Sequence, residues 1–167
     1  KMKYLLINRH AESPWSNFKV SDHDRELSLK GVRDSSMMGQ RLMNKQISFD
    51  LMLSSSAIRA LTTCQLIASE VNYPLYEVCA KKDIYSSNID TLKDIIFRID
   101  DRVNSLAVFG HNPVLHMLSE ELAERKIERF PTCSMAYFEL KINSWKDLPD
   151  SKRKMLFFDY PENEQHS

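Results

Sequence analysis

Glycine is scarce in this chain. The 167 residues contain only three glycines, Gly31, Gly39 and Gly110. Neither the GxGxxG motif that binds dinucleotides nor the GxxxxGK[ST] phosphate-binding loop can be written with them, so both motifs are excluded. If the protein binds a phosphate group, side chains must therefore supply much of the binding.

Cysteine pairs, long apolar runs and an excess of one charge are also lacking. Cys64, Cys79 and Cys133 are an odd number, lie far apart and form no CxxC pair, which is typical of reduced thiols in a cytoplasmic protein. No apolar run is long enough for a signal-peptide core or a membrane span. The 23 basic residues balance 23 acidic ones, so no overall field favours nucleic acid or an anionic membrane. We therefore expect a cytoplasmic protein with neither nucleic acid nor membrane as a partner.

Short apolar segments alternate with helical patterns through residue 125. This alternation predicts an α/β fold with a mostly parallel central sheet of about six strands and helices on both faces. No linker or repeat interrupts it, so one domain is expected over residues 1–167. The predicted strands are residues 3–8, 50–54, 74–78, 105–110, 134–142 and 154–160, with at least one of the last two antiparallel. The predicted helices span residues 28–46, 56–71 and 88–99, and a fourth begins near residue 112.

Capping residues mark the starts of these helices. Ser28 is suited to cap the first helix and Asn88 or Asp90 the third. Asn112 is expected to cap the fourth, with Pro113 at its first position, where a missing N–H costs nothing. On the first helix, the inner side is expected to carry Val32, Gly39, Leu42 and Met43.

Unusual side chains follow three of the predicted strands. The first strand ends on Arg9 and His10, the second leads to Arg59 in the next helix, and the fourth leads to His111. Ligands of open parallel sheets bind beyond the carboxyl ends of the strands, so these four side chains are expected to converge. An arginine fork matches phosphoryl oxygens, a neutral imidazole can attack phosphorus, and a protonated one can donate to it. The set indicates a phosphoryl-transfer site.

Other interpretations of these residues are open. Taken alone, His10 could be a capping or core histidine and Arg59 a surface residue. A metal site is a weaker interpretation, since neither HxH, HExxH nor CxxC occurs. A serine nucleophile lacks the GxSxG motif, and the serines at 54–56 are expected to form turns and caps. No role is expected for the remaining histidines, which are His23, His116 and His166.

Five motifs, in order, resemble the histidine phosphatase superfamily and, within it, the small bacterial phosphohistidine phosphatases of SixA type. These motifs are RHAES, LSLKGVRDSSMMGQRL, LMLSSSAIRALTTCQLIA, VFGHNP and RFPTCSMAYFEL, within a resemblance that runs from Leu5 to Pro161. The resemblance implies a phosphoglycerate mutase-like α/β fold. Asn8 departs from the usual apolar residue before the arginine, and Ala11 replaces the glycine of the RHG motif.

The resemblance also implies roles. His10 would be the phosphorylated nucleophile, Arg9 and Arg59 would bind the phosphoryl oxygens, and His111 would complete the pocket. No metal and no organic cofactor are implied. The implied activity is dephosphorylation of phosphohistidine in a signalling or phosphorelay protein. The alternatives are a small-molecule phosphatase of the same superfamily and a weakly catalytic phosphoprotein-binding module.

One departure concerns the catalytic acid. Larger members carry a carboxylate soon after the third strand, where this chain has Ser86 and Ser87. Its absence weighs against mutase activity and against hydrolysis of alkyl phosphate esters, because an alkoxide leaving group needs a proton. Glu12 and Asp83 remain candidate substitutes. A surface role is the more common one for such carboxylates.

Overall fold

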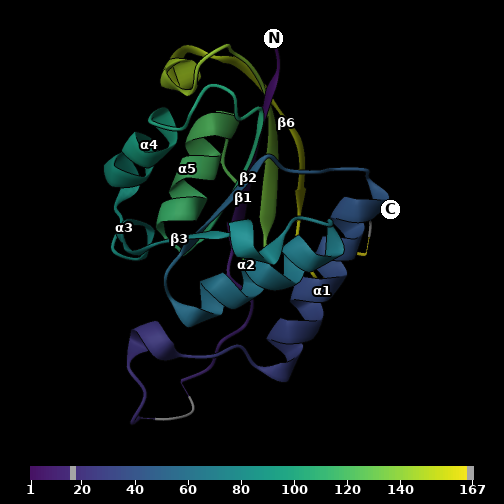
Figure 1. Cartoon of the computed structure of the whole chain (residues 1–167), viewed down its shortest axis with the longest axis vertical. Coiled ribbons are helices and arrows are strands. Elements are labelled where there is room, and N and C mark those ends of the chain that lie inside the picture. The colour runs from purple at the N-terminus through teal and green to yellow at the C-terminus, as the bar shows by residue number, and fades with distance from the viewer. Residues whose placement is uncertain (16–17, 165–167) are drawn as a thin grey trace.

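A computed structural model describes residues 1–15 and 18–164 of the chain (Figure 1). Within these residues, six strands form one sheet in the order β3-β2-β4-β1-β5-β6. The neighbours among β1 to β4 pair in parallel, whereas β5 is antiparallel to both β1 and β6. The strands are β1 (Lys3–Arg9), β2 (Leu51–Ser55), β3 (Cys79–Lys81), β4 (Ser105–Gly110), β5 (Met135–Lys141) and β6 (Lys152–Asp159). The prediction of a mostly parallel α/β sheet is confirmed.

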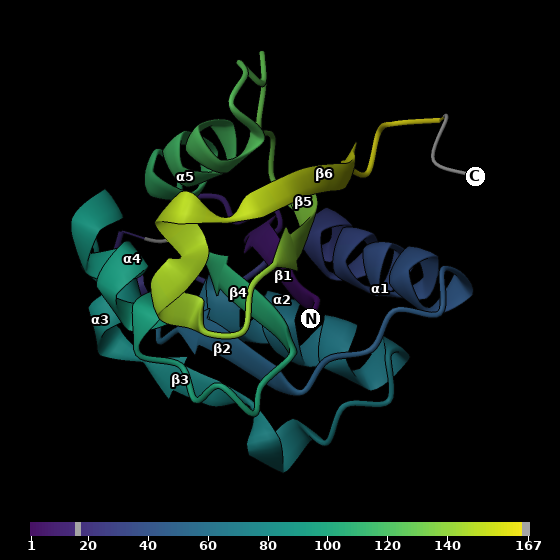
Figure 2. The same cartoon turned by 90° about the horizontal axis from the view of Figure 1, so that it is seen from above.

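Helices cover both faces of the sheet. The α-helices are α1 (Leu29–Asn44), α2 (Ile58–Glu70), α3 (Lys82–Tyr85), α4 (Ile89–Phe97) and α5 (Val114–Ala123). Within residues 1–15 and 18–164, three 3₁₀-helices accompany them: η1 (Asp22–Asp24), η2 (Leu75–Glu77) and η3 (Trp145–Asp150). Figure 2 shows α1 and α2 on one side of the sheet and α4 and α5 on the other. No helix in the described part of the chain is both long and apolar enough to span a bilayer.

The alternation of strand side chains divides the core in two. Leu5 and Ile7 of β1 pack toward α4 and α5, together with Trp145 of η3. Leu6, which points to the other side of the sheet, packs with residues of α1 and α2 such as Met38 and Ile67. Burial on both faces explains why β1 is an almost continuous apolar run that stops only at its last two residues.

The start of α1 explains the glycine of the LSxxG motif. The hydroxyl of Ser28 caps the helix by accepting a hydrogen bond from the Gly31 amide at 3.0 Å. A Cβ atom at Gly31 would collide with the backbone carbonyl oxygen of Glu12. The amide of Ser28 donates to the same carbonyl at 3.0 Å. Only glycine therefore lets the helix approach the segment that follows His10.

Three local predictions are wrong. Residues 74–78 are not a strand: they form η2, whose Leu75 and Tyr76 are exposed and have no core to face, and the edge strand β3 follows instead. Val32 lies on the exposed side of α1. Asn112 does not cap α5, because its side-chain amide donates to the Phe130 carbonyl at 2.9 Å and the helix begins at Val114 after a cis Asn112–Pro113 peptide. The cap expected from Asn88 is present, with its side chain accepting from the Thr91 amide.

Candidate active site

The four predicted site residues meet at the carboxyl ends of the parallel strands. β1 and β4 pair in register, with Arg9 opposite Gly110, so the next residues, His10 and His111, emerge side by side. Their ring centroids are 5.3 Å apart and the rings are inclined at 54°. Arg59 lies in the first turn of α2, which follows β2, the other neighbour of β4. In Figure 1 this edge is the lower end of the sheet, near the start of α2.

The main chain of His10 is held from both sides. Its amide donates to the Gly110 carbonyl at 3.0 Å, and its carbonyl accepts from the Cys133 amide at 2.9 Å. In the side chain, Nδ1 lies 2.7 Å from the Ala11 carbonyl oxygen. A carbonyl can only accept, so Nδ1 carries the hydrogen and the lone pair of the neutral ring is on Nε2. The ring therefore offers Nε2 as a nucleophile.

Thr63 joins the arginine helix to the histidine loop. Its hydroxyl donates to the Arg59 carbonyl at 2.7 Å and accepts from the Ala11 amide at 3.0 Å. Thr63, the second threonine of the LMLSSSAIRALTTCQLIA motif, thus links the two segments that carry Arg59 and His10. This positioning role was not anticipated from the sequence.

Burial and positive neighbours keep both site histidines neutral. Burial is the main reason that the pKa of His10 falls to about 3; the bond to Ala11 opposes the shift, and His111 and the arginines add to it. Burial likewise lowers the pKa of His111 to about 4, with Arg59 as the next cause. Both rings are therefore neutral near pH 7 in the unliganded protein, as a nucleophilic His10 requires.

Three buried side-chain nitrogens of the site have no hydrogen-bond partner among the described residues. They are Nε of Arg9, Nε of Arg59 and Nδ1 of His111. The Nε2 atom of His111 lies 2.8 Å from the Ser55 hydroxyl, whose oxygen accepts from the Ala57 amide at 3.1 Å. That hydroxyl can give its hydrogen to Nε2, which leaves the ring hydrogen on Nδ1. Unsatisfied buried donors are rare, and a group of them around one imidazole suits an oxyanion.

Asp22, which the sequence analysis missed, occupies the other edge of Arg59. Arg59 Nη1 donates to the Asp22 carbonyl at 2.6 Å and Nη2 to its carboxylate at 3.1 Å. The same carboxylate accepts from the Tyr85 hydroxyl at 2.7 Å and from Arg25 Nε at 3.1 Å. Burial alone would raise the pKa of Asp22, but the bonds from Tyr85 and Arg59 bring it below its usual value. Asp22 is therefore an ionised member of the site.

Of the histidines expected to have no role, His23 lies close to the site. Its Nε2 atom is 2.9 Å from the Ser56 hydroxyl, and its ring meets Tyr85 edge-on at 4.9 Å. His116 instead packs on Phe130 from α5, with Nε2 at 2.6 Å from a backbone carbonyl. His166 lies outside the described residues. Ser56 is not the helix cap that was expected, because the N-cap residue of α2 is Ala57, which makes no side-chain cap hydrogen bond.

The candidate acids have other partners or positions. The Glu12 carboxylate accepts from the Ser28 hydroxyl at 2.8 Å, at the start of α1. Asp83 is exposed on α3, and Ser86 and Ser87 donate to backbone carbonyls of the same turn. Asn8, unexplained in the sequence, is buried and donates from its amide to the Arg9 carbonyl at 2.9 Å.

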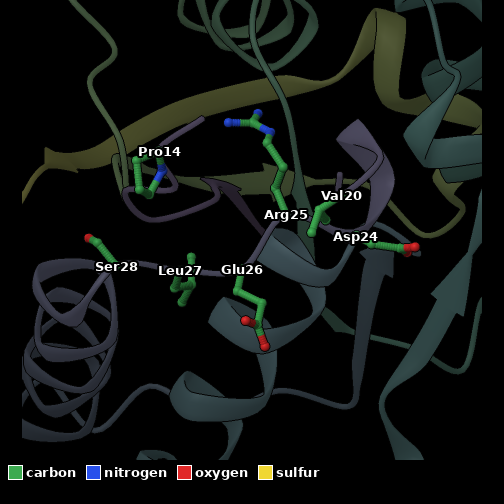
Figure 3. A pocket seen from close by; sticks show the side chains of 7 residues that line it. All are labelled: Pro14, Val20, Asp24, Arg25, Glu26, Leu27 and Ser28. Carbon is green, nitrogen blue, oxygen red and sulfur yellow. The ribbon is translucent and has the colours of Figure 1, made fainter. Parts of the chain in front are cut away.

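In the part of the chain that the structure describes, neither a group of metal ligands nor the hollow beside the η1 segment accounts for the four predicted residues. In residues 1–15 and 18–164, no three His, Cys, Asp or Glu side chains are grouped as metal ligands. A hollow of about 290 Å³ lies beside the segment between the end of η1 and the start of α1, and none of the four predicted residues lines it (Figure 3). It is lined by Pro14, Val20, Asp24, Arg25, Glu26, Leu27 and Ser28.

The fold places two histidines and two arginines together at the carboxyl ends of its parallel strands, as the resemblance seen in the sequence predicts. Residues 5–84 match the model of the histidine phosphatase superfamily (branch 1). Over this part, nearly half of its length, the chain is similar to the histidine phosphatase superfamily. This finding confirms the resemblance seen in the sequence.

Relatives of similar length extend the likeness over the whole chain. An uncharacterized protein of Mycobacterium tuberculosis is 29% identical over 163 residues, which cover 92% of this chain and 99% of the relative. The SixA protein of Nakamurella multipartitia has the same fold, with a TM-score of 0.83, 20% identity and 98% of both chains covered. The protein histidine phosphatase SixA complexed with tungstate gives a TM-score of 0.79 at 19% identity, over 95% of this chain and 97% of that one.

Proposed function

We propose that this protein is a histidine phosphatase that dephosphorylates phosphohistidine through a covalent intermediate on His10. The observation that carries the proposal is the grouping of a neutral imidazole, whose Nε2 carries the lone pair, with three buried nitrogens, on Arg9, Arg59 and His111, that lack partners among the described residues. The solved relative that is complexed with tungstate supports it, because tungstate is a tetrahedral oxyanion like phosphate.

The reaction has two steps. Nε2 of His10 attacks phosphorus, the bond from phosphorus to the substrate nitrogen breaks, and the leaving imidazole takes a proton and departs neutral. Water then attacks the phosphoryl group on Nε2, loses a proton, and releases inorganic phosphate and the neutral His10 ring. In both steps the N–H groups of Arg9, Arg59 and His111 stabilise the charge on the phosphoryl oxygens.

The leaving group decides the substrate class. An imidazole can be protonated before or during cleavage of the P–N bond, whereas an alkoxide needs a positioned acid that contributes roughly 10²–10⁴-fold. Glu12 is bound to Ser28 and Asp83 is exposed on α3, and among the described residues no hydrogen bond joins either carboxylate to His10 or His111. We infer that the substrate is a phosphoramidate, and that its natural form is phosphohistidine on a signalling or phosphorelay protein.

A substrate panel with trapping tests this function. Phosphohistidine peptide and phosphoimidazole are expected to be cleaved much faster than an alkyl phosphate, and acid-labile phosphate should be recovered on His10 after rapid quenching. His10→Ala should abolish both turnover and labelling, while His116→Asn, outside the site, should retain both. Full activity of His10→Ala would contradict the covalent mechanism.

The same panel tests the missing acid. Glu12→Gln and Asp83→Asn are expected to lose little activity toward phosphoramidates. If alkyl phosphates are cleaved as fast as phosphoramidates and either variant removes that activity, the protein is a small-molecule phosphomonoesterase with its own acid. If phosphoryl groups bind without turnover of any substrate, it is a phosphoprotein-binding module.

A further inference from the structure

The guanidinium of Arg59 has two occupied nitrogens and one free nitrogen. Asp22 accepts from Nη1 through its backbone carbonyl and from Nη2 through its carboxylate. Nε, on the other edge of the planar group, is buried and has no partner among the described residues. Asp22 and a bound phosphoryl group can therefore use different edges of the same guanidinium, and neither has to displace the other.

Asp22 is itself fixed by side chains from other segments. The Tyr85 hydroxyl, at the end of α3, donates to one carboxylate oxygen, and Arg25 Nε donates to the other. The Tyr85 ring meets His111 edge-on at 5.7 Å between centroids. The Asp22 carboxylate thus contacts Arg59 of α2 directly, and it also binds Tyr85, whose ring lies against His111.

The carboxylate also faces the solvent. The Asp22 side chain is 36% exposed, whereas that of Arg59 is 7% exposed. A ligand that reaches the buried Nε of Arg59 thus places its phosphoryl group one guanidinium away from a fixed negative charge. A second anionic group carried next to that phosphoryl group is repelled by Asp22, whereas a neutral or cationic substituent is not.

We propose that Asp22 is a positioning and specificity residue that orients Arg59 and selects against phosphorylated ligands with a carboxylate beside the phosphoryl group. The favoured ligands carry the phosphoryl group on a neutral or cationic nitrogen base. This inference rests on the proposed function, since it takes the four predicted residues as the phosphoryl site. It deepens that function by stating the charge of the accepted substituent.

The test uses two ligands that differ by one carboxylate, methylphosphonate and phosphonoacetate, and measures their dissociation constants by calorimetry. Asp22→Asn keeps an oxygen acceptor for Arg59 but removes the charge. It should shift the relative affinity about three- to tenfold in favour of phosphonoacetate, and the shift should shrink as salt is added. Asp24→Asn is the matched control: Asp24 lies two residues away, is bound to His23 and has no contact with Arg59, so its loss should leave the ratio unchanged.

Positioning is tested separately. Asp22→Ala, which removes both charge and side-chain acceptor, should weaken methylphosphonate binding more than Asp22→Asn does. An unchanged affinity ratio in Asp22→Asn would overturn the charge selection. Tighter methylphosphonate binding in Asp22→Ala would overturn the positioning role, because Asp22 would then be a competitor for Arg59.

Ligand binding needs no turnover, so these outcomes are independent of the substrate panel. If phosphohistidine is not cleaved but the affinity ratio shifts as expected, the proposed function fails and the role of Asp22 stands. If phosphohistidine is cleaved and the ratio does not move, the proposed function stands and Asp22 has no part in selection.

Discussion

Acidification should destabilise this protein through its two site histidines. In the folded protein the pKa of His10 is about 3 and that of His111 about 4. In the unfolded chain both should titrate near the ordinary value of about 6.5. Because the pKa values are lower in the folded protein, the unfolded chain binds more protons than the folded protein does at every pH between the folded and unfolded pKa values. The stabilisation is therefore present above about pH 6.5 and is lost as the pH falls toward 4 and below.

The expected size of the loss follows from these values. Between pH 7 and pH 5, each imidazole protonates in the unfolded chain but stays neutral in the folded protein, which costs about 2 kcal/mol per histidine. The two together lower the free energy of unfolding by about 4 kcal/mol over this interval. Both rings are largely buried, so solvent screening takes away little of the effect.

Urea denaturation at pH 7 and pH 5 measures the loss. His10→Asn and His111→Asn should each recover about 2 kcal/mol of the pH-dependent difference, and the double variant about twice that. Comparing each variant with itself at the two pH values cancels the contributions of other titrating groups. An equal loss in the wild type and in both single variants would show that the imidazoles are not held neutral, and the case for a nucleophilic His10 would fail with it.

Two substitutions test other parts of the site. Arg59→Ala should lower turnover by roughly 10²–10³-fold and Arg59→Lys by less, because lysine restores the charge but not the fork that Asp22 and the ligand share. Equal small effects in steady-state assays would show that Arg59 does not act on the phosphoryl group. Gly31→Ala should lower the free energy of unfolding, measured by urea titration, by about 1–3 kcal/mol, because the added Cβ would collide with the Glu12 carbonyl. Val32→Ala, on the exposed face of α1, should change this free energy little. A Gly31→Ala protein as stable as Val32→Ala would contradict the close approach.

Much of the fold could be predicted because strand and helix patterns are local. The apolar runs of β1, β2 and β4 and the caps at Ser28 and Asn88 were readable from the sequence. The segment at 74–78 was misassigned because it is apolar in composition yet exposed, a property that depends on the edge position of β3. Asn112 was misassigned because a distant carbonyl, that of Phe130, takes its amide.

Only part of the site could be predicted, because only some of its residues follow strands that are visible in the sequence. Arg9, His10, Arg59 and His111 follow strand ends, and parallel strands bring such ends together. Asp22 follows no strand: it lies in an irregular polar segment, and only the folded chain places it against Arg59. A carboxylate in such a segment carries no local sign of its partner.

The hydrogen bonds that hold the His10 main chain on both sides bear on the order of events in turnover. Because Gly110 and Cys133 fix the backbone, the proposed mechanism keeps a phosphoryl group on Nε2 among the same donors from its arrival to its release. The departing group and the incoming water both use the side of phosphorus that faces away from Nε2. The dephosphorylated product must therefore leave before water can enter, so the lifetime of the phosphoenzyme depends on how fast the product dissociates.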